Sequence, residues 1–177
     1  PELDAFRFAS YCAKEGVGEA EGTLENGAAV IAALRKAVNA MDEAEVPAEE
    51  RYLFITPTLH GMIEDMDGDA SRQVLARFAG VALVPHTRFY TAIKQKSGRT
   101  GETEGGYEKD TGAADINFMV IHKGAVIQFE KHVAPKIIDP DQNPDADAWK
   151  FGYRNVGIAD VYQNKTAGVY VSHKAVG

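Results

Sequence analysis

At 177 residues, 45% of them hydrophobic and 25% charged, the chain has the length and composition of one large folded domain or two small ones, which excludes a disordered segment. Its 26 acidic and 19 basic residues give a net charge of −7, which disfavours tight, non-specific binding to nucleic acid. No apolar run approaches the length that spans a bilayer, no signal peptide opens the chain, and the single Cys12 fits a reducing compartment.

Two helices are predicted at the start of the chain. Residues 2–15 place apolar side chains on one helical stripe, and Gly16 is a usual place for a helix to stop. Residues 25–47 form the clearer helical pattern, which Pro47 ends. The apolar side chains at helical spacing in this second segment are Val30, Ile31, Leu34, Val38 and Met41.

The period then changes to that of strands. The segment "RYLFITP" (51–57) is short, aromatic and β-branched, which predicts a buried strand. A short helix is predicted to follow from Pro57. Residues 80–93 predict a further strand, interrupted or bent at Pro85.

From Lys94 to Ala114 the composition shifts to Gly, Thr, Glu and Lys. This predicts a long solvated loop, which we expect to be poorly ordered in isolation because it offers little apolar area to offset the entropy of ordering. The basic cluster of Lys94, Lys96 and Arg99 falls within it.

Strand-like sequence returns in the last third of the chain. Residues 115–132 are strand-like and broken at Gly124, and residues 148–173 alternate aromatic or branched residues with polar ones. The turn sequence at 163–168 predicts that this last part is a hairpin of two antiparallel strands. The order of elements predicts an α+β fold, with helices packed on a mixed or antiparallel sheet and a long C-terminal antiparallel hairpin.

The stretch "DPDQNPDADAW" (139–149) sets acidic residues at alternating places, as calcium-binding loops do. Its sixth place is Pro144, where such a loop turns on a glycine, and its twelfth is Lys150, where the loop needs a glutamate. A second stretch, from Asp65, fails in the same way. We therefore interpret 139–149 as a connector and predict that the chain binds no metal. The less favoured alternative, a calcium-binding module, would use Asp139, Asp141, Asn143 and Asp145.

The sequence contains no recognisable catalytic constellation. Its five histidines lie far apart, without the spacing of a metal pair on a helix. Neither a G-x-S-x-G elbow nor a phosphate-binding G-x-x-x-x-G-K-[ST] loop occurs, and Cys12 lies on an apolar helical stripe where core packing is its ordinary role. We predict that the chain is no enzyme and has no cofactor. The less favoured alternative is a hydrolase whose catalytic residues are histidines. These are His60, His86, His122, His132 and His173.

Several motifs occur in order along nearly the whole chain: "ELDAFRFA", "VPAEERYLFITP", "VALVPHTRFYT", "INFMVIHKGAV", "KIIDP", "DAWKFGYR" and "NKTAGVY". Together they resemble the major capsid proteins of tailed bacteriophages and prophages. The resemblance implies the Hong Kong 97-like capsid fold. Residues 1–24 would then be a helix and connector of the peripheral domain, residues 25–126 the axial domain, and residues 127–177 the peripheral strands. It also implies that the sequence begins after the N-terminal arm and extended loop of full-length members.

This resemblance implies a structural coat protein that self-assembles into the icosahedral shell of a tailed phage or prophage. Its partners would be identical subunits in capsomers, with scaffold and portal proteins in the full-length context, and neither a membrane nor a specific nucleic-acid sequence. It would be found in the virion capsid, and in the bacterial cytoplasm before assembly. An encapsulin-like bacterial shell protein is the alternative. The candidate intersubunit loop that the resemblance places near a capsomer axis carries Lys94, Lys96, Arg99, Glu102 and Glu104.

Overall fold

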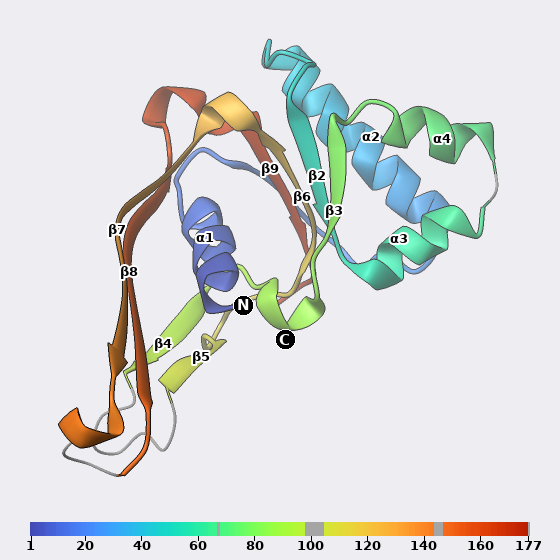
Figure 1. The fold of residues 1–177 in the computed structure, drawn as a ribbon. Helices are drawn as coiled ribbons and strands as arrows, with labels where there is room; N and C mark the ends of the chain where they lie inside the picture. Colours follow the sequence, from blue (N-terminus) through green and yellow to red (C-terminus); the bar gives the residue numbers. More distant parts are fainter. Residues whose placement is uncertain (67, 98–104, 144–146, 177) are drawn as a thin grey trace.

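The computed structural model describes residues 1–66, 68–97, 105–143 and 147–176. A five-stranded sheet with helices on both of its faces forms the body of the molecule, and a long two-stranded ribbon leaves the body on one side (Figure 1). No helix among the described residues is long and apolar enough to cross a bilayer.

The helices predicted near the start of the chain and after Pro57 are confirmed. The helices are α1 (Glu2–Cys12), α2 (Gly27–Glu43), α3 (Pro57–Glu64) and α4 (Asp69–Leu75). The Asn26 side chain accepts a hydrogen bond from the backbone N–H of Ala29 and so caps the start of α2. The short α4 is not predicted, because only Ser71 and Val74 on it are buried and leave a weak periodic signal.

The body sheet has the strand order β1-β9-β6-β2-β3. The outer pairs, β1 with β9 and β2 with β3, run parallel, and the inner pairs run antiparallel. The predicted α+β fold with a mixed sheet is therefore confirmed. The strands are β1 (Gly18–Glu21), β2 (Arg51–Ile55), β3 (Gly80–Leu83), β4 (Ile93–Ser97), β5 (Gly105–Lys109), β6 (Ile116–His122), β7 (Val126–Ile138), β8 (Lys150–Val161) and β9 (Val169–His173).

The core forms two layers because successive side chains of a strand point to opposite faces of the sheet. On β6, Phe118 and Val120 pack under α2 and α3, whereas Met119 and Ile121 pack on the α1 side. All four side chains are buried. Figure 1 shows α2, α3 and α4 on one face of the sheet and α1 on the other, between the sheet and the ribbon.

A long antiparallel hairpin is present, but the predicted pairing of its strands is wrong. We expected residues 163–168 to turn one strand back on the next. Instead β8 pairs with β7, and β9 enters the body sheet between β1 and β6. The segment Gln163–Gly168 is a 3-10 turn that carries the chain from the ribbon to the sheet. At its end Gly168 lies so close to Ala125 that a Cβ on the glycine would collide with the alanine side chain.

The domain boundaries proposed at 24 and 126 stay a prediction. The body sheet takes strands from all three proposed ranges: β1 from residues 1–24, three strands from 25–126, and β9 from 127–177. The ribbon, by contrast, starts at Val126 and lies apart from the sheet.

Candidate assembly surfaces

The ribbon of β7 and β8 is the first candidate surface. The two strands pair from Val126↔Val161 at the body to Ile138↔Lys150 near the tip. At about 3.3 Å per residue, the 13 residues of β7 extend roughly 40 Å. Neither outer edge of the ribbon pairs with another strand among the residues that the structure describes.

Helix α1 holds the inner end of the ribbon. Arg7 Nη2 lies 2.8 Å from Glu130 Oε1 on β7, and Lys14 Nζ lies 3.1 Å from Asp160 Oδ1 on β8. The hydrogen bonds from the Val161 N–H and from Lys14 lower the pKa of Asp160. Val161 itself is buried in the core. The ribbon is therefore anchored at its base, and we call residues 131–138 and 150–156 beyond this anchor the outer ribbon.

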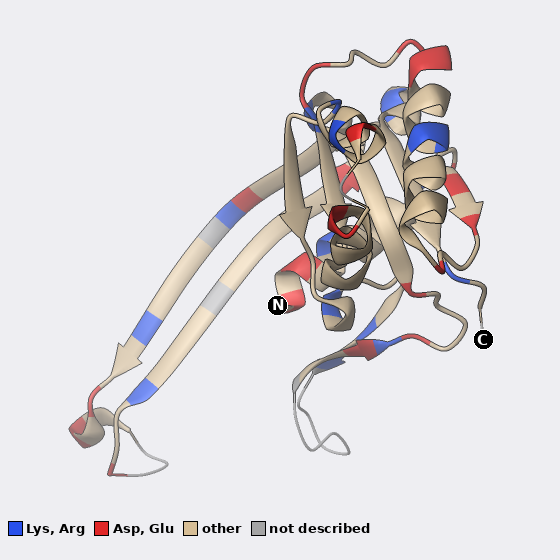
Figure 2. Cartoon of the chain, turned by 90° about the vertical axis from the view of Figure 1, so that its right-hand side faces the viewer, with Lys and Arg blue, Asp and Glu red and all other residues tan. Residues whose placement is uncertain are grey.

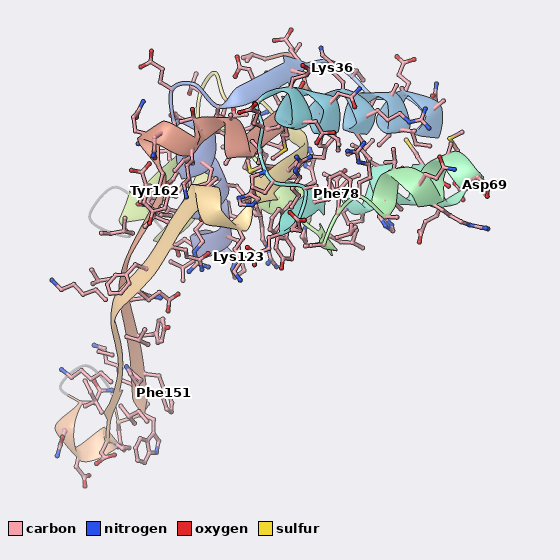
Figure 3. All side chains as sticks on the ribbon, turned by 90° about the horizontal axis from the view of Figure 1, so that it is seen from above. Lys36, Asp69, Phe78, Lys123, Phe151 and Tyr162 are labelled. Carbon is pink, nitrogen blue, oxygen red and sulfur yellow. The ribbon has the colours of Figure 1, made fainter. Side chains whose placement is uncertain are left out.

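One face of the outer ribbon is apolar. A bulge between Glu130 and His132 shifts the register, after which the cross-strand pairs on this face are Val133↔Asn155, Pro135↔Tyr153 and Ile137↔Phe151. Phe151 is 74% exposed, Tyr153 67% and Ile137 63%. Figure 3 shows Phe151 far out along the ribbon, away from the body. We define Val133, Pro135, Ile137, Phe151 and Tyr153 as the apolar face.

The opposite face of the ribbon is also partly apolar near its base. Phe129 pairs across the strands with Ile158, and both are more than half exposed. An isolated two-stranded ribbon is marginally stable in water, and contiguous exposed apolar patches of this kind mark interaction sites. The ribbon therefore has the properties of a surface that another polypeptide covers.

The charges of the outer ribbon are all positive. Its sequence contains Lys131, Lys136, Lys150 and Arg154 and no acidic residue, within a chain whose net charge is −7. Figure 2 shows blue bands along the ribbon, and red bands only near its base and at its tip. The outer ribbon therefore combines apolar side chains with a local positive charge.

The stretch that resembled a calcium loop joins the two strands of the ribbon at its tip. Pro140–Gln142 forms a 3-10 turn, and the Asn143 Nδ2 donates a hydrogen bond to the Ala148 carbonyl oxygen at 2.7 Å. The interpretation of this stretch as a connector agrees with its place between β7 and β8. Residues 144–146 lie outside the described residues, and they include Pro144, at the sixth place of the calcium-loop comparison, and the candidate ligand Asp145.

The predicted intersubunit loop is in part a hairpin. Instead of a continuous loop from 94 to 114, β4 pairs with β5. Lys94 Nζ and Lys96 Nζ lie 3.7 and 2.8 Å from the Glu108 carboxylate. The hydrogen bond from Lys96 lowers the pKa of Glu108. Tyr107 donates a hydrogen bond to the Thr87 carbonyl oxygen and ties the hairpin to the body. The remaining predicted site residues, Arg99, Glu102 and Glu104, lie outside the described residues.

A second candidate surface lies at the β1 edge of the body sheet, which pairs only with β9 among the described strands. Residues 15–25 include four glutamates and no basic residue. All four side chains are exposed, and none forms an ion pair with another residue that the structure describes. We call this segment the acidic edge, and its glutamates are Glu15, Glu19, Glu21 and Glu25.

The acidic edge borders a hollow of about 210 Å³. Its apolar lining comes from Val17, Val171 and Val176, of which Val176 is 53% exposed. Cys12 and Glu19 also line it. Burial raises the pKa of the Cys12 thiol to about 12, with a further contribution from the negative charge of Glu19. The thiol is therefore protonated and unreactive at neutral pH.

A larger groove of about 280 Å³ lies between α1 and the body sheet. Phe8, Tyr52, Phe54 and Ile121 form much of its apolar wall. The Phe8 ring contacts Phe54 and Phe89 edge to face, at centroid distances of 5.4 and 4.9 Å. The groove is thus an opening beside the packing contact that holds α1 on the sheet.

Two of the five histidines, His60 and His86, each lie beside a carboxylate. His86 Nε2 lies 3.1 Å from Asp115, and His60 Nδ1 lies 3.4 Å from Glu64 in the next turn of α3. Burial raises the pKa of Asp115, but hydrogen bonds from Lys109 and His86 outweigh it, and the net shift is downward. Within the described part of the chain, no group of three or more His, Cys, Asp or Glu side chains is placed to hold a metal ion.

The apolar face and the acidic edge were not identified from the sequence. Alternation in residues 148–173 predicts a hairpin of two antiparallel strands, whereas Phe151 lies far from the body and Tyr153 beside it in β8 is 67% exposed. The turn-rich stretch 139–149 between two strand-like runs is the signal that could have indicated a projecting hairpin. The acidic edge depends on the parallel pairing of β1 with β9, which local sequence does not encode.

No protein-family description and no curated protein matches the chain. Several solved structures match the fold of the chain. A virus-like particle from Pyrococcus furiosus has a TM-score of 0.66 at 9% identity, over 96% of this chain and 61% of that one. A structure from Mycobacterium phage Che8 has a TM-score of 0.60 at 14% identity, over 96% of this chain and 57% of the phage chain. The capsid of cyanophage P-SCSP1u has a TM-score of 0.59 at 16% identity, over 99% of this chain and 61% of the cyanophage chain.

The chain therefore spans about three fifths of the length of each of these proteins. At such low identity the likeness establishes the fold alone. Because the match covers nearly all of this chain, it includes the body sheet, α1 and the ribbon together. The chain has the Hong Kong 97-like capsid fold that its sequence motifs predicted.

Proposed function

We propose that the chain belongs to a structural coat protein that self-assembles into the icosahedral shell of a tailed phage or prophage. The observation that carries this proposal is the match of 96–99% of the chain to a virus-like particle and to phage structures, one of them a capsid. The exposed apolar face of the ribbon supports it, since a subunit of a shell needs surfaces that other copies cover.

The proposal includes the partners and place of such a protein. Identical subunits would be the main partners, with scaffold and portal proteins in the full-length context and no sequence-specific contact to nucleic acid. The virion capsid would be the final location, after assembly in the bacterial cytoplasm. A structural role requires no catalytic residue, so we propose that the chain is no enzyme. The phage origin of two of the three structures favours a phage coat over an encapsulin-like shell protein.

Sedimentation velocity of the complete gene product that contains this chain tests the proposal. We expect large, fast-sedimenting particles from the unchanged protein. Replacing Phe151 and Tyr153 together by Ser should abolish them, because both side chains lie on the apolar face. Met66→Ser serves as the control, since Met66 is an exposed apolar residue that follows α3, and Figure 1 shows α3 away from the ribbon. Small species only, from the unchanged protein at all concentrations, would contradict the proposal.

A further inference from the structure

The outer ribbon and the acidic edge lie on opposite sides of the molecule. In Figure 3 the ribbon leaves the body on one side, and β1, the pale-blue strand beside α2, lies on the other. Figure 2 shows the same separation, with the ribbon directed away from the red bands of β1. Two surfaces placed in this way cannot meet within one molecule, because the ribbon is anchored by α1 and points outward.

The two surfaces are complementary in charge. The outer ribbon contains four basic residues and no acidic one, and the acidic edge contains four glutamates and no basic one. Elsewhere on the body many acidic side chains are already paired, for example Asp42 with Arg51 and Glu50 with Lys123. Lys136 and Lys150 alternate along the strands with the side chains of the apolar face, so they point to the other face of the ribbon. Their charge therefore steers the approach of the two surfaces, and the apolar face makes the contact.

The apolar face is also large enough to make a substantial contact. The apolar face projects two aromatic rings and, by the usual size of such side chains, exposes on the order of 500 Å² of side-chain surface. That is more than half of the roughly 800 Å² that each partner buries in a standard interface. The hollow of about 210 Å³ beside the acidic edge is lined by three valines together with polar side chains such as Thr91 and His173, and it could hold one such ring.

We propose that the outer ribbon of one copy docks on the acidic edge of a second copy, with an aromatic ring of its apolar face in the hollow beside β1. This inference deepens the proposed function and rests on it for the choice of a second copy as the occupant. Because the contact joins two different surfaces, it is heterologous, and its repetition forms a closed ring of subunits where the rotation between neighbours divides a full turn.

Heterotypic cysteine cross-linking tests this contact on the 177-residue chain itself. In a Cys12→Ala background, one preparation carries Tyr153→Cys on the ribbon and the other, of different mass through a tag, carries Glu19→Cys on the acidic edge. A short bismaleimide is added at high protein concentration to each alone and to the mixture. The control mixture pairs Tyr153→Cys with Asp69→Cys, an exposed residue at the start of α4 that Figure 3 shows at the end of the body away from β1.

We expect dimers of mixed mass in the first mixture, at least about tenfold above the control mixture, and little dimer in either preparation alone. Reversal of the ribbon charges by Lys131→Glu, Lys136→Glu and Lys150→Glu should remove this excess, and combination with Glu15→Lys, Glu21→Lys and Glu25→Lys on the partner should restore it. Dimers of Tyr153→Cys alone would show a ribbon-to-ribbon contact and overturn the inference. So would a yield in the first mixture no higher than in the control.

The outcome is separable from that of the proposed function. Particles from the complete gene product without the heterotypic cross-link leave the shell proposal standing and overturn the docking of ribbon on edge. The heterotypic cross-link without particles leaves the contact standing and overturns the shell proposal.

Discussion

Replacement of Phe8 by Ala should detach α1 from the sheet and destabilise the whole molecule. Phe8 is 7% exposed and contacts Phe54 and Phe89 edge to face. Removal of the ring withdraws about 150 Å² of apolar surface from the core, which at about 25 cal/mol per Å² is close to 4 kcal/mol. The adjoining groove lets the site relax, so the two lost aromatic contacts add little.

A loss of about 4 kcal/mol corresponds to a fall in Tm of roughly 8–16 °C for a chain of this size. Thermal and urea unfolding followed by circular dichroism measure it. Phe151→Ala is the matched control, because the same substitution at a residue that is 74% exposed should cost less than about 1 kcal/mol. Equal losses in the two variants, or a loss below about 1 kcal/mol for Phe8→Ala, would refute the reasoning that α1 is held by this aromatic contact.

Two further predictions concern stability. Gly61 lies in α3 with nothing near an added methyl group, so Gly61→Ala should stabilise the chain by about 0.5–1 kcal/mol in urea unfolding. Gly27→Ala should destabilise the chain by more than about 2 kcal/mol, because the added Cβ would collide with the Met62 carbonyl. The opposite order of the two variants would contradict the close packing of α2 on α3. The hydrogen bond from the buried Arg51, and after it the one from Arg77, lowers the pKa of Asp42 below its ordinary 3.8. The Asp42 carboxylate therefore stabilises the folded chain fully above pH 3.8, and this stabilisation is lost as the pH falls through the lower pKa of the folded state. Urea midpoints of the unchanged chain and Asp42→Asn should therefore converge as the pH is lowered below 3.8, and a constant gap down to the acid limit would contradict the assignment.

The helices and the class of fold could be predicted because their signals are local. Helix α2 has apolar residues at helical spacing, Asn26 as its cap and Pro47 after its end, and all of these act within one segment. The motifs that resemble phage coat proteins added the type of fold, which periodicity does not supply. Their prediction of the Hong Kong 97-like fold is confirmed by solved structures at 9–16% identity.

Strand pairing could not be predicted in the same way. β8 and β9 look alike in sequence, but β9 is buried on both faces between β1 and β6, and β8 extends into solvent with β7. What separates them is the close approach of Gly168 to Ala125, a contact between residues far apart in the chain. The acidic edge and the apolar face both depend on such non-local pairings. For this reason the residues that we propose for assembly differ from the loop residues predicted from the sequence.

Electron microscopy of the complete gene product tests the central claim most directly. If the chain belongs to a coat protein, purified product should form closed, hollow particles of uniform diameter, and the body sheet and projecting ribbon should fit the density of each subunit in an averaged map. A product that stays folded and monomeric at every concentration and salt tested, with no closed particle in any field, would contradict the account.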